Sequence, residues 1–403
     1  MNHYDITIVG AGMVGSSLAC AIAQSDVEKK LHIALIDVAE ETQTFSNENF
    51  DPRVVALTQA SQNFLTQLRV WDEIAAQRIC AYSQMHVWDG EGTACMHFDA
   101  AEVASPYLGH IIENSVISLS LKNKIGCHPQ IHFMHPINLL DIQLAETNHT
   151  NTIGIVPNRG EPFTSRLLIG ADGAQSRVRE LANFSTREWN YDQKAIVTTV
   201  ETELPHQFTA WQRFMPTGPL AFLPLPNVNG RHFCSIVWSA ENALADELMT
   251  MTDEEFSIAL EKSFERKLGN IVGVAQRFVY PLRQRHAKNY IQPQVALVGD
   301  AAHNIHPLAG QGVNLGFLDA AALAQEIYRA QERSIPLEDF SILRRYQRQR
   351  LGHNLSMMSA MEGFKQLFSN QSLSLAWLRN FGIHKLNSSS AIKKIIIQQA
   401  MGL

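Results

Sequence analysis

The segment from Val295 to Gly316 constrains the fold of this chain more than any other stretch. It opens with an uninterrupted apolar run, Val295–Val298, which is typical of a strand buried on both faces of a parallel sheet. Gly299 and Asp300 follow directly, and the ends of such strands are where open α/β sheets bind their ligands. The glycines of Gly310-Gln-Gly-Val-Asn-Leu-Gly316 then lead into a helical pattern. The backbone N–H groups at the start of that helix would stabilise a negative charge.

A second constraint lies near the amino terminus, where a strand, a glycine-rich turn and a helix follow one another. Tyr4–Val9 is a strand pattern, Gly10-Ala-Gly12-Met-Val-Gly15 comes next, and a second strand at Ile33–Ile36 ends at Asp37. In this context the G-x-G-x-x-G pattern predicts a dinucleotide site. Gly10 would make the tight turn, Gly12 would let the backbone approach the pyrophosphate, and Gly15 would let helix and strand pack closely. Asp37 has the spacing of an acid that accepts ribose hydroxyls, whereas the alternative is a purely structural glycine turn.

The amino-terminal motif alone does not distinguish NAD from FAD. The distant Gly299-Asp300 segment does, because it predicts a long cofactor whose other end is bound by a second motif. The negative charge that suits the Gly310–Asn314 turn is the anionic N1–C2=O edge of a reduced flavin. Asp300 is then expected to hydrogen-bond hydroxyls of the ribityl chain. FAD is therefore the predicted cofactor.

Two further segments carry polar residues that suit a cofactor site. Asp51-Pro-Arg53-Val-Val-Ala-Leu57 contains an arginine that is either a surface charge or a partner for a phosphate or the flavin edge. Leu108-Gly-His-Ile-Ile-Glu-Asn114 leads into a helical pattern from Ser115 to about Lys124. Glu113-Asn114 at that point is also a plausible helix-capping pair, so both interpretations stay open.

A third segment repeats the arrangement of the Val295 region. An apolar strand from Leu167 to Gly170 is followed by Asp172-Gly173 and then by a helix start. Arg177 and Arg179 beyond this turn fit either a phosphate or a solvated basic turn.

The composition is that of a globular protein of 403 residues, which is long enough for two domains. The net charge of −6 argues against nucleic acid as a partner, because such partners require a basic surface. The five cysteines are scattered without a C-x-x-C pair, which predicts reduced thiols in the cytoplasm and no metal site. No apolar run reaches the roughly 18 residues of a membrane span. Asp5 and the absence of a basic start argue against a signal peptide.

Between residues 190 and 279 the pattern changes to strands separated by Pro, Gly and Asn turns. Met85–Phe98, with a turn at Asp89-Gly90, predicts a hairpin of the same unit, and Asp253–Leu268 predicts one amphipathic helix. A mostly antiparallel sheet with one covering helix suits a substrate domain over the flavin. The expected strands are Ala195–Leu204, Gln212–Met215, Leu220–Leu225 and Arg231–Ser239. The aromatic residues of this region are individually typical of a core but as a set suit an apolar aromatic substrate: Trp211, Phe214, Phe222, Phe233 and Trp238.

These motifs together strongly resemble the group A FAD-dependent aromatic-ring monooxygenases, over a match from Ile6 to Leu403. Within that group, the runs at 51–57, 108–114 and 299–316 are similar to those of the bacterial ubiquinone-biosynthesis hydroxylases. The nearest likeness is to the enzymes that hydroxylate C5 of a 2-polyprenylphenol, and it is carried by residues 234–239, residues 343–350 and the closing Gln-Ala-Met-Gly-Leu. Enzymes that act at other ring carbons share most of the motifs. Asp37 departs from the pattern, because many relatives carry glutamate there.

The resemblance implies an FAD-dependent monooxygenase that hydroxylates the ring of a polyprenylphenol intermediate in ubiquinone biosynthesis. It would use NAD(P)H as co-substrate and O2 through a flavin C4a-hydroperoxide, most simply at C5 and alternatively at the carbon of a 6-methoxyphenol or of demethoxyubiquinol. The implied partners are a prenylated phenol or quinol lipid, O2 and other ubiquinone-biosynthesis proteins. The implied location is the cytoplasm, with at most peripheral contact with the inner membrane.

The resemblance also implies site residues. Arg53 would lie near the flavin, Asp172 and Gly173 would serve both the FAD pyrophosphate and NAD(P)H access, and Pro307 would line the flavin face. His303 and His306 are candidate bases for the phenol proton or else structural histidines, so no catalytic base is assigned. The full set of expected cofactor-binding residues is Gly10, Gly12, Gly15, Asp37, Arg53, Asp172, Gly173, Gly299, Asp300, Gly310, Gln311, Gly312, Val313 and Asn314.

The fold class expected from the patterns and the resemblance is α/β. We expect an FAD-binding Rossmann-like domain of the glutathione-reductase type, an inserted mostly antiparallel β-sheet substrate domain, and C-terminal helices. The predicted boundaries are residues 1–78, 108–185 and 278–335 for the first, 79–107 and 186–277 for the second, and 336–403 for the last. Two basic or apolar segments near the carboxyl terminus have two interpretations. Leu343–Arg350 is expected to be a solvated helix face and Ala391–Met401 a docked tail. Alternatively, both make a weak contact with anionic lipid or with a protein partner.

Four other functions compete with this interpretation. A flavin-dependent halogenase should carry a W-x-W-x-I-P motif, which this sequence lacks, and a prenyl-lipid reductase would not need O2. A non-catalytic, FAD-stabilised subunit of the biosynthetic complex would bind flavin without oxidising NAD(P)H. A plain NAD-dependent dehydrogenase is disfavoured by the second flavin motif.

Overall fold

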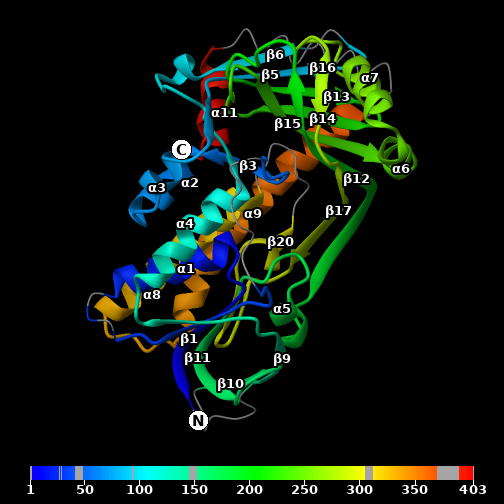
Figure 1. Cartoon of the computed structure of the whole chain (residues 1–403). Helices are drawn as coiled ribbons and strands as arrows, with labels where there is room; N and C mark the ends of the chain where they lie inside the picture. Colours follow the sequence, from blue (N-terminus) through cyan, green and yellow to red (C-terminus); the bar gives the residue numbers. More distant parts are fainter. Residues whose placement is uncertain are drawn as a thin grey trace.

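A parallel sheet joins the two motif-bearing regions of the sequence in the computed structural model, which describes residues 2–26, 28, 30–40, 49–92, 95–144, 152–304, 312–369 and 390–402 (Figure 1). Its parallel strands lie in the order β19 (Val295–Leu297), β11 (Phe163–Gly170), β1 (His3–Val9), β2 (Ile33–Ile36) and β8 (Ile131–Met134). Antiparallel strands extend it: β18 (Ile291–Gln292) pairs with β19, and β10 (Ile153–Pro157) links β11 to β9 (Leu139–Gln143). The central strands are buried on both faces, since Ile6, Ile8 and Leu168 have no exposed surface.

Helices α1 (Met13–Ser25), α4 (Asn114–Gly126) and α8 (Gly312–Glu332) lie side by side against this sheet (Figure 1). Helix α8 also packs against α2 (Gln59–Gln67) and against the long helix α9 (Phe340–Ser369). The shorter helices near them are α3 (Trp71–Ala75), which contacts α2 and α4, and α5 (Arg177–Leu181), which follows β11. One hydrophobic core runs through the strands and these helices.

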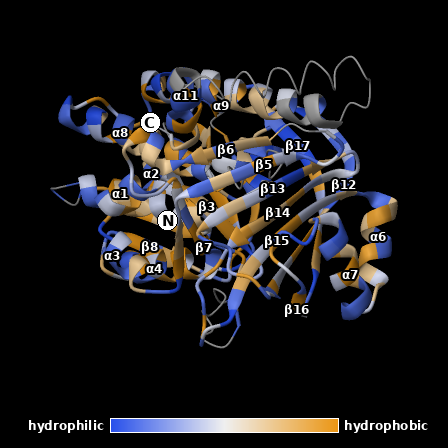
Figure 2. Ribbon diagram, turned by 90° about the horizontal axis from the view of Figure 1, so that it is seen from above, coloured by the Kyte–Doolittle hydropathy of each residue, from blue (hydrophilic) through white to orange (hydrophobic). Residues whose placement is uncertain are grey.

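A second, mostly antiparallel sheet lies beyond the first, and helices α6 (Asn242–Thr250) and α7 (Asp253–Ser263) lie along one side of it (Figure 2). Its strand order is β20 (His303–Asn304), β17 (Phe278–Ala287), β12 (Thr186–Thr202), β15 (His232–Glu241), β14 (Gly218–Pro224), β13 (Thr209–Met215), β5 (Gln84–Asp89) and β6 (Cys95–Asp99), with β16 (Ile271–Val274) on β12. A separate hydrophobic core forms between this sheet and α7, around the stacked rings of Phe222 and Phe264.

A small three-stranded sheet, β3 (Val54–Thr58), β7 (Gly109–Glu113) and β4 (Ile79–Tyr82), lies between the two larger ones. Ala56 and Ile111 from this sheet meet Leu225 from the larger sheet in a small apolar cluster, against which Phe50 and Phe233 pack. The last helix, α11 (Ser390–Ala400), docks on a short 3-10 turn, η1 (Ala100–Val103). Within the described ranges, no helix is both long enough and apolar enough to cross a membrane.

The expected α/β fold class is confirmed, together with the hairpin of β5 and β6 and the four strands of the second sheet. One helix prediction was wrong in extent. The helix expected over residues 253–268 ends at Ser263, because Glu265 and Arg266 have left-handed backbones with φ of 56° and 51°.

The predicted domain boundaries stay a prediction. Residues 186–277 and 84–99 supply most of the second sheet, but β17 and β20 also join it from a segment assigned to the FAD-binding domain. Strand β4 starts at Ile79, within the predicted substrate domain, and pairs instead with β7 in the three-stranded sheet. The two units therefore share strands instead of meeting only at linkers.

Candidate cofactor site

The motifs singled out in the sequence converge at the carboxyl ends of four neighbouring parallel strands. Val9 pairs with both Ile36 and Gly170, and Gly170 pairs with Leu297, so the four strand ends are in register. The residues that follow these ends are Gly10, Asp37, Asp172 and Gly299-Asp300. Ligands of open α/β sheets bind outside the carboxyl ends of the strands, so this edge is the candidate site.

The three amino-terminal glycines differ in their surroundings: Gly10 and Gly15 are closely packed, and Gly12 is open. Gly10 has a φ of +102°, and a Cβ atom added to it would lie 2.4 Å from the carbonyl oxygen of Ala171, after β11. At Gly15 an added Cβ would lie 1.8 Å from the carbonyl oxygen of Gly10, so helix α1 packs directly on the turn. At Gly12, no atom of the described part of the chain lies within 4 Å of such a Cβ, and no described side chain caps α1 there. The backbone at Gly12 is thus open to a ligand.

Asp37 lies beside the same turn and is already hydrogen-bonded to backbone. The N–H of Ala11 donates to its Oδ2 at 2.5 Å, and the N–H of Ala39 donates to its Oδ1 at 2.8 Å. The sequence predicted the position of this carboxylate but not these bonds, which fix its orientation. Each carboxylate oxygen can accept more than one hydrogen bond, so a ribose hydroxyl can still bind.

The turn after β11 is held by Asp172 and Arg179. One oxygen of Asp172, Oδ2, accepts the N–H groups of Arg177 and Val178 at 2.7 and 3.1 Å, while its Oδ1 is buried without a partner. Burial raises the pKa of this carboxyl group, and hydrogen bonds from its neighbours, including Ser176, oppose that shift. Gly173 has a φ of +76° and open space beside it. An orphaned buried acceptor next to an open backbone indicates a missing ligand at this turn.

Arg179 is neither a phosphate ligand nor part of a solvated turn. It is buried, and its guanidinium donates to the carbonyl oxygens of Ala174 at 2.7 Å and Ala301 at 2.9 Å. This side chain therefore ties the turn after β11 to the turn after β19. Arg177 lies outside, in an exposed ion pair with Glu180.

The turn after β19 is a short 3-10 segment, η2 (Gly299–Ala301), in which Gly299 has a φ of +59°. Asp300 is exposed on one side. Burial by the surrounding protein nevertheless raises the pKa of its carboxyl group. The charge of His303 opposes this shift, and the charge of Asp319 adds to it. Among the described residues, a Cβ added at Gly312, the first residue of α8, would have only Asp300 Oδ1 within 4 Å, at 3.8 Å. The Asp300 carboxylate and the open start of α8 therefore face each other, and Val313 follows in the same first turn.

The side chain of Asn314 forms hydrogen bonds to other parts of the protein. Its Oδ1 accepts the N–H of Thr58 at 3.0 Å and the hydroxyl of Ser61 at 2.7 Å, and its Nδ2 donates to the carbonyl oxygen of Ala56 at 2.9 Å. The amide thus clamps α8 to the junction of β3 and α2. Any contact of Asn314 with a cofactor would come from its backbone.

The Asp51–Arg53 and Glu113–Asn114 segments, separate in the sequence, are neighbours in the structure. Strands β3 and β7 pair Val54 with Glu113, and the N–H of Asn114 donates to the carbonyl oxygen of Arg53 at 2.9 Å. Glu113 is buried, accepts the N–H of Asp51 at 2.6 Å and forms a two-point ion pair with Arg78. Glu113 is thus no side-chain cap of α4 but the anchor of the loop that carries Arg53. Arg78 was missed in the sequence, which gives no local signal for it.

Several expected site residues remain to be placed. His306, Pro307, Gly310 and Gln311 lie outside the described residues. His303 has no exposed surface and binds Asp319, which favours the structural interpretation over a role as base. The expected aromatic set does not form one surface. Phe222 and Trp238 belong to the hydrophobic core beneath α7, and Trp211 packs against that core. Phe233 packs instead on the separate apolar cluster at the three-stranded sheet.

The arrangement fits the FAD expected from the sequence. Three glycines, Gly12, Gly173 and Gly312, leave their backbone open along one edge, and Asp172 keeps an unused buried acceptor there. Two carboxylates, Asp37 and Asp300, follow strands separated by β1 and β11, so acceptors for hydroxyl groups lie toward both ends of this edge. In the described part of the chain, no group of three or more His, Cys, Asp or Glu side chains is placed to hold a metal ion.

Comparison with known proteins identifies relatives along nearly the whole chain. The FAD binding domain family matches residues 3–358. The 3-demethoxyubiquinol 3-hydroxylase of Escherichia coli strain K12 is 36% identical over 399 residues, which cover 99% of this chain and 98% of that protein. The human mitochondrial ubiquinone biosynthesis monooxygenase COQ6 is 31% identical over 434 residues, covering 98% and 92%.

Solved structures share the fold at lower identity. The probable FAD-dependent monooxygenase pqsL of Pseudomonas aeruginosa superimposes with a TM-score of 0.77 at 22% identity, covering 95% of this chain and all of that one. The p-nitrophenol 4-monooxygenase PnpA of Pseudomonas putida DLL-E4 gives a TM-score of 0.78 at 16% identity, covering 100% and 99%.

Proposed function

The chain belongs to the FAD binding domain family and is an FAD-dependent monooxygenase, and from this premise we propose that it hydroxylates the aromatic ring of a prenylated phenol or quinol in ubiquinone biosynthesis. The co-substrates would be NAD(P)H and O2. The convergence of the motif residues at four adjacent strand ends carries the proposal, because these ends together would form one site for a long flavin cofactor. The whole-length similarity to ubiquinone-pathway hydroxylases supports the substrate class.

Each part of the site would have one task in holding FAD. Gly10 and Gly12 would admit the pyrophosphate at the start of α1, and Asp37 would accept the ribose hydroxyls. Asp300 would accept ribityl hydroxyls, while Gly312 and Val313 would present backbone N–H groups to the anionic edge of the ring. Bound FAD, reduced by NAD(P)H, supplies the activated oxygen atom for the ring. The remaining proposed ligands are Gly15, Arg53, Asp172, Gly173, Gly299, Gly310, Gln311 and Asn314, acting through backbone or side chain.

Two candidate substrates are supported by different observations. The Escherichia coli relative is named for hydroxylation of 3-demethoxyubiquinol, which supports a quinol of that type. The segments at residues 234–239 and 343–350 instead favour C5 of a 2-polyprenylphenol. Both reactions place one hydroxyl on an electron-rich ring with a prenyl tail, and they differ in the other ring substituents and in the ring carbon that is hydroxylated.

The deciding experiment compares the two substrates directly. Purified protein is reconstituted with FAD, and NAD(P)H oxidation in air is measured with a short-chain 2-prenylphenol and with a short-chain 3-demethoxyubiquinol. We expect a flavin spectrum, faster NAD(P)H oxidation with one of the two compounds, and a product heavier by one oxygen atom that carries label from 18O2. The compound that yields this product decides the ring position.

Three outcomes would overturn the proposal. Protein that cannot be reconstituted with FAD would contradict the cofactor assignment. FAD-bound protein that oxidises NAD(P)H with neither compound would favour a non-catalytic subunit of a biosynthetic complex. Product formed equally well without O2 would indicate a reductase.

A further inference from the structure

One carboxylate that the sequence analysis did not single out, Asp319 on α8, is fully buried and receives four donors. Its Oδ2 accepts the N–H of Gly299 at 3.1 Å and Nε2 of His303 at 2.5 Å. Its Oδ1 accepts Nε of Arg350 at 2.8 Å and Nδ2 of Asn354 at 3.1 Å. Such a buried charge is tolerated only when it is paired and hydrogen-bonded, so these contacts specify one arrangement.

The four donors come from two regions that are distant in the sequence. Gly299 and His303 begin and end the turn that follows β19, whereas Arg350 and Asn354 lie on α9. Burial would raise the pKa of Asp319, but His303 and Arg350 outweigh it and lower that pKa to about 2. The carboxylate is therefore charged across the physiological range, and it joins the turn, α8 and α9 at one point.

Asp300 lies between the two turn residues that Asp319 holds. The same turn is fixed from the other side by β17, because His286 pairs with His303 and the N–H of Ala287 donates to the carbonyl oxygen of Ala302 at 2.8 Å. With both ends of the turn fixed, the Asp300 carboxylate faces the start of α8. The charge of Asp319 also acts at Asp300, where it raises the pKa, while the charge of His303 lowers it.

We propose that Asp319, His303 and Arg350 form a positioning cluster for the flavin. They hold the Asp300 turn against the first turn of α8, and the balance of their charges sets the midpoint potential of the bound flavin. None of the three touches the cofactor in this role. Their action is indirect, through the backbone of Gly299–His303 and through the local electrostatic potential. The inference rests on the proposed binding of FAD by Asp300 and α8.

The sign of each charge gives a test that a purely structural role cannot mimic. Asp319→Asn removes a negative charge and leaves Arg350 uncompensated, which stabilises the anionic reduced flavin and raises its midpoint potential. Arg350→Gln removes the positive charge and should lower that potential. Loosening of the fold alone would not shift the potential in opposite directions in the two variants.

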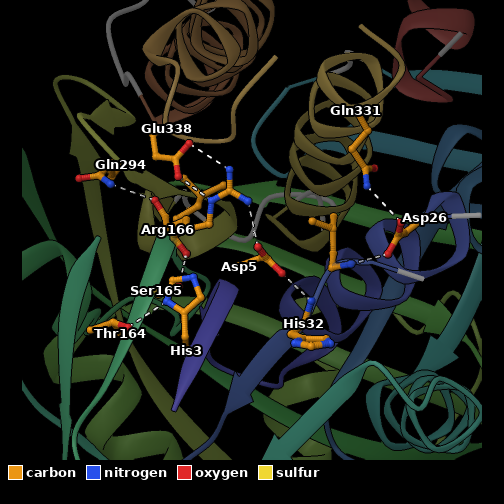
Figure 3. A network of polar contacts seen from close by, with 12 residues as sticks. His3, Asp5, Asp26, His32, Thr164, Ser165, Arg166, Gln294, Gln331 and Glu338 are labelled. Atoms are coloured by element: carbon orange, nitrogen blue, oxygen red, sulfur yellow. Dashed lines mark hydrogen bonds and ion pairs between the residues drawn. The ribbon is translucent and has the colours of Figure 1, made fainter. Parts of the chain in front are cut away.

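A matched control network lies elsewhere on the same sheet (Figure 3). Arg166 on β11 donates to Glu338 at 2.5 and 3.1 Å and to Asp5 on β1 at 3.0 Å, and so joins the sheet to the segment before α9. Asp5 is four residues before the end of β1, about 13 Å from the candidate site at 3.3 Å per residue. Glu338→Gln should therefore lower the stability of the apoprotein while leaving FAD affinity and potential unchanged.

The experiment prepares apoprotein of each variant and measures the dissociation constant for FAD by quenching of flavin fluorescence, the midpoint potential of the bound flavin, and the thermal stability of the apoprotein. We expect Asp319→Asn and His303→Gln to weaken FAD binding about 10- to 100-fold, the usual effect of losing a residue that orients a ligating group. Arg350→Lys, which keeps the charge, should retain the wild-type potential and is the control for Arg350→Gln.

FAD affinity at the wild-type level in Asp319→Asn and His303→Gln, with stability lowered as in Glu338→Gln, would overturn the inference. Potentials shifted in the same direction in the two charge variants would also overturn its electrostatic part. Failure of the proposed function is distinguishable, because it would appear in the wild-type protein as absent flavin or absent hydroxylation. Wild-type protein that binds FAD but hydroxylates neither compound would leave the positioning cluster standing.

Discussion

Gly12 and Gly15 are close in the sequence, yet a methyl group at each position meets different surroundings. At Gly15 it would collide with the carbonyl oxygen of Gly10, whereas at Gly12 it would meet no atom of the described residues within 4 Å. We expect Gly15→Ala to destabilise the apoprotein by about 1–3 kcal/mol, as overpacking does. Gly12→Ala should change that stability by less than about 0.5 kcal/mol but weaken FAD binding, because the proposed cofactor would occupy that space. Urea unfolding of the apoproteins and FAD titration separate the two effects, and wild-type FAD affinity in Gly12→Ala would contradict the proposed role.

His110 makes the fold sensitive to acid. It is buried on β7 against the rings of Trp71 and Tyr107, and burial lowers the pKa of its imidazole to about 4. In the unfolded chain the pKa is near 6.5, so the unfolded state takes up the proton first as pH falls, and stability is lost between about pH 6.5 and 4.

We expect His110→Gln to reduce that loss by on the order of 1–3 kcal/mol, measured as the free energy of unfolding in urea at about pH 7 and pH 4.5. Part of the acid sensitivity should remain, because burial, with help from His303 and Arg187, also lowers the pKa of His286 to about 4. An identical pH dependence in the variant would contradict the assignment.

The sequence predicted those site residues that stand in a local pattern. Asp37 and Asp300 were found because each follows an apolar strand at a recognisable spacing. Asp319 and Arg78 were missed, and the two roles predicted for Arg179 were wrong, because each side chain is defined by partners far away in the chain: Asp319 by two helices and a turn, Arg179 by two turns, and Arg78 by Glu113. Nothing in the residues next to them distinguishes these side chains from ordinary helix or loop charges.

At the scale of elements, the docking of α11 depends on one face of a short helix. Ile397 is 2% exposed and packs with Met401 on Ala100 of η1, and Nζ of Lys393 donates to Glu102 at 2.6 Å. Ile395 on the same helix is 61% exposed. The tail Ala391–Met401, predicted either to dock on the protein or to contact a membrane or partner, therefore docks on the protein through one face of α11. An apolar residue, Ile395, remains on its exposed face.

We expect Ile397→Asp to weaken this docking by about 2–4 kcal/mol, because it removes a buried side chain and places a charge in its position. Hydrogen exchange of residues 390–402 should accelerate strongly in Ile397→Asp. Ile395→Asp makes the same substitution on the exposed side of the same helix and should leave that exchange unchanged. Equal exchange in the two variants would show that α11 is not held by this face.

Element types were predictable where periodicity was long and boundaries were marked, as in β1, α1 and β19. The two failures have different causes. Residues 264–268 keep a helical spacing of apolar side chains, since Phe264 and Leu268 are buried, but the left-handed backbone between them breaks the helix. Strand β3 was not predicted, because the short run Val54–Leu57 has no alternation, and only its pairing with β7 makes it a strand. Local backbone conformation decided the first case and tertiary pairing the second.

At the scale of the whole molecule, the two large sheets are joined through the candidate site. Strand β17 belongs to the second sheet, and its partner β20 is the continuation of the Asp300 turn that follows β19 of the first. The strands shared by the predicted FAD-binding and substrate domains therefore meet at the candidate site. A domain order could be inferred from changes in strand pattern, but shared strands such as β17 cannot be seen in one sequence.

This connection predicts that FAD stabilises both sheets together and not only the first. A ligand that binds the folded state alone adds about 2.7 kcal/mol at a free concentration 100 times its dissociation constant. Because the Asp300 turn is held by β17 as well as by α8 and α9, that stabilisation should reach the core around Phe222 and Phe264.

Thermal unfolding of apoprotein and FAD-bound protein, followed by hydrogen exchange in β14 and in β11, measures this stabilisation in each sheet. We expect the protection of both strands to rise by a similar factor on FAD binding, because opening either sheet then requires release of the cofactor. Protection that rises in β11 alone would mean that the second sheet unfolds independently, and the turn would then be a passive linker.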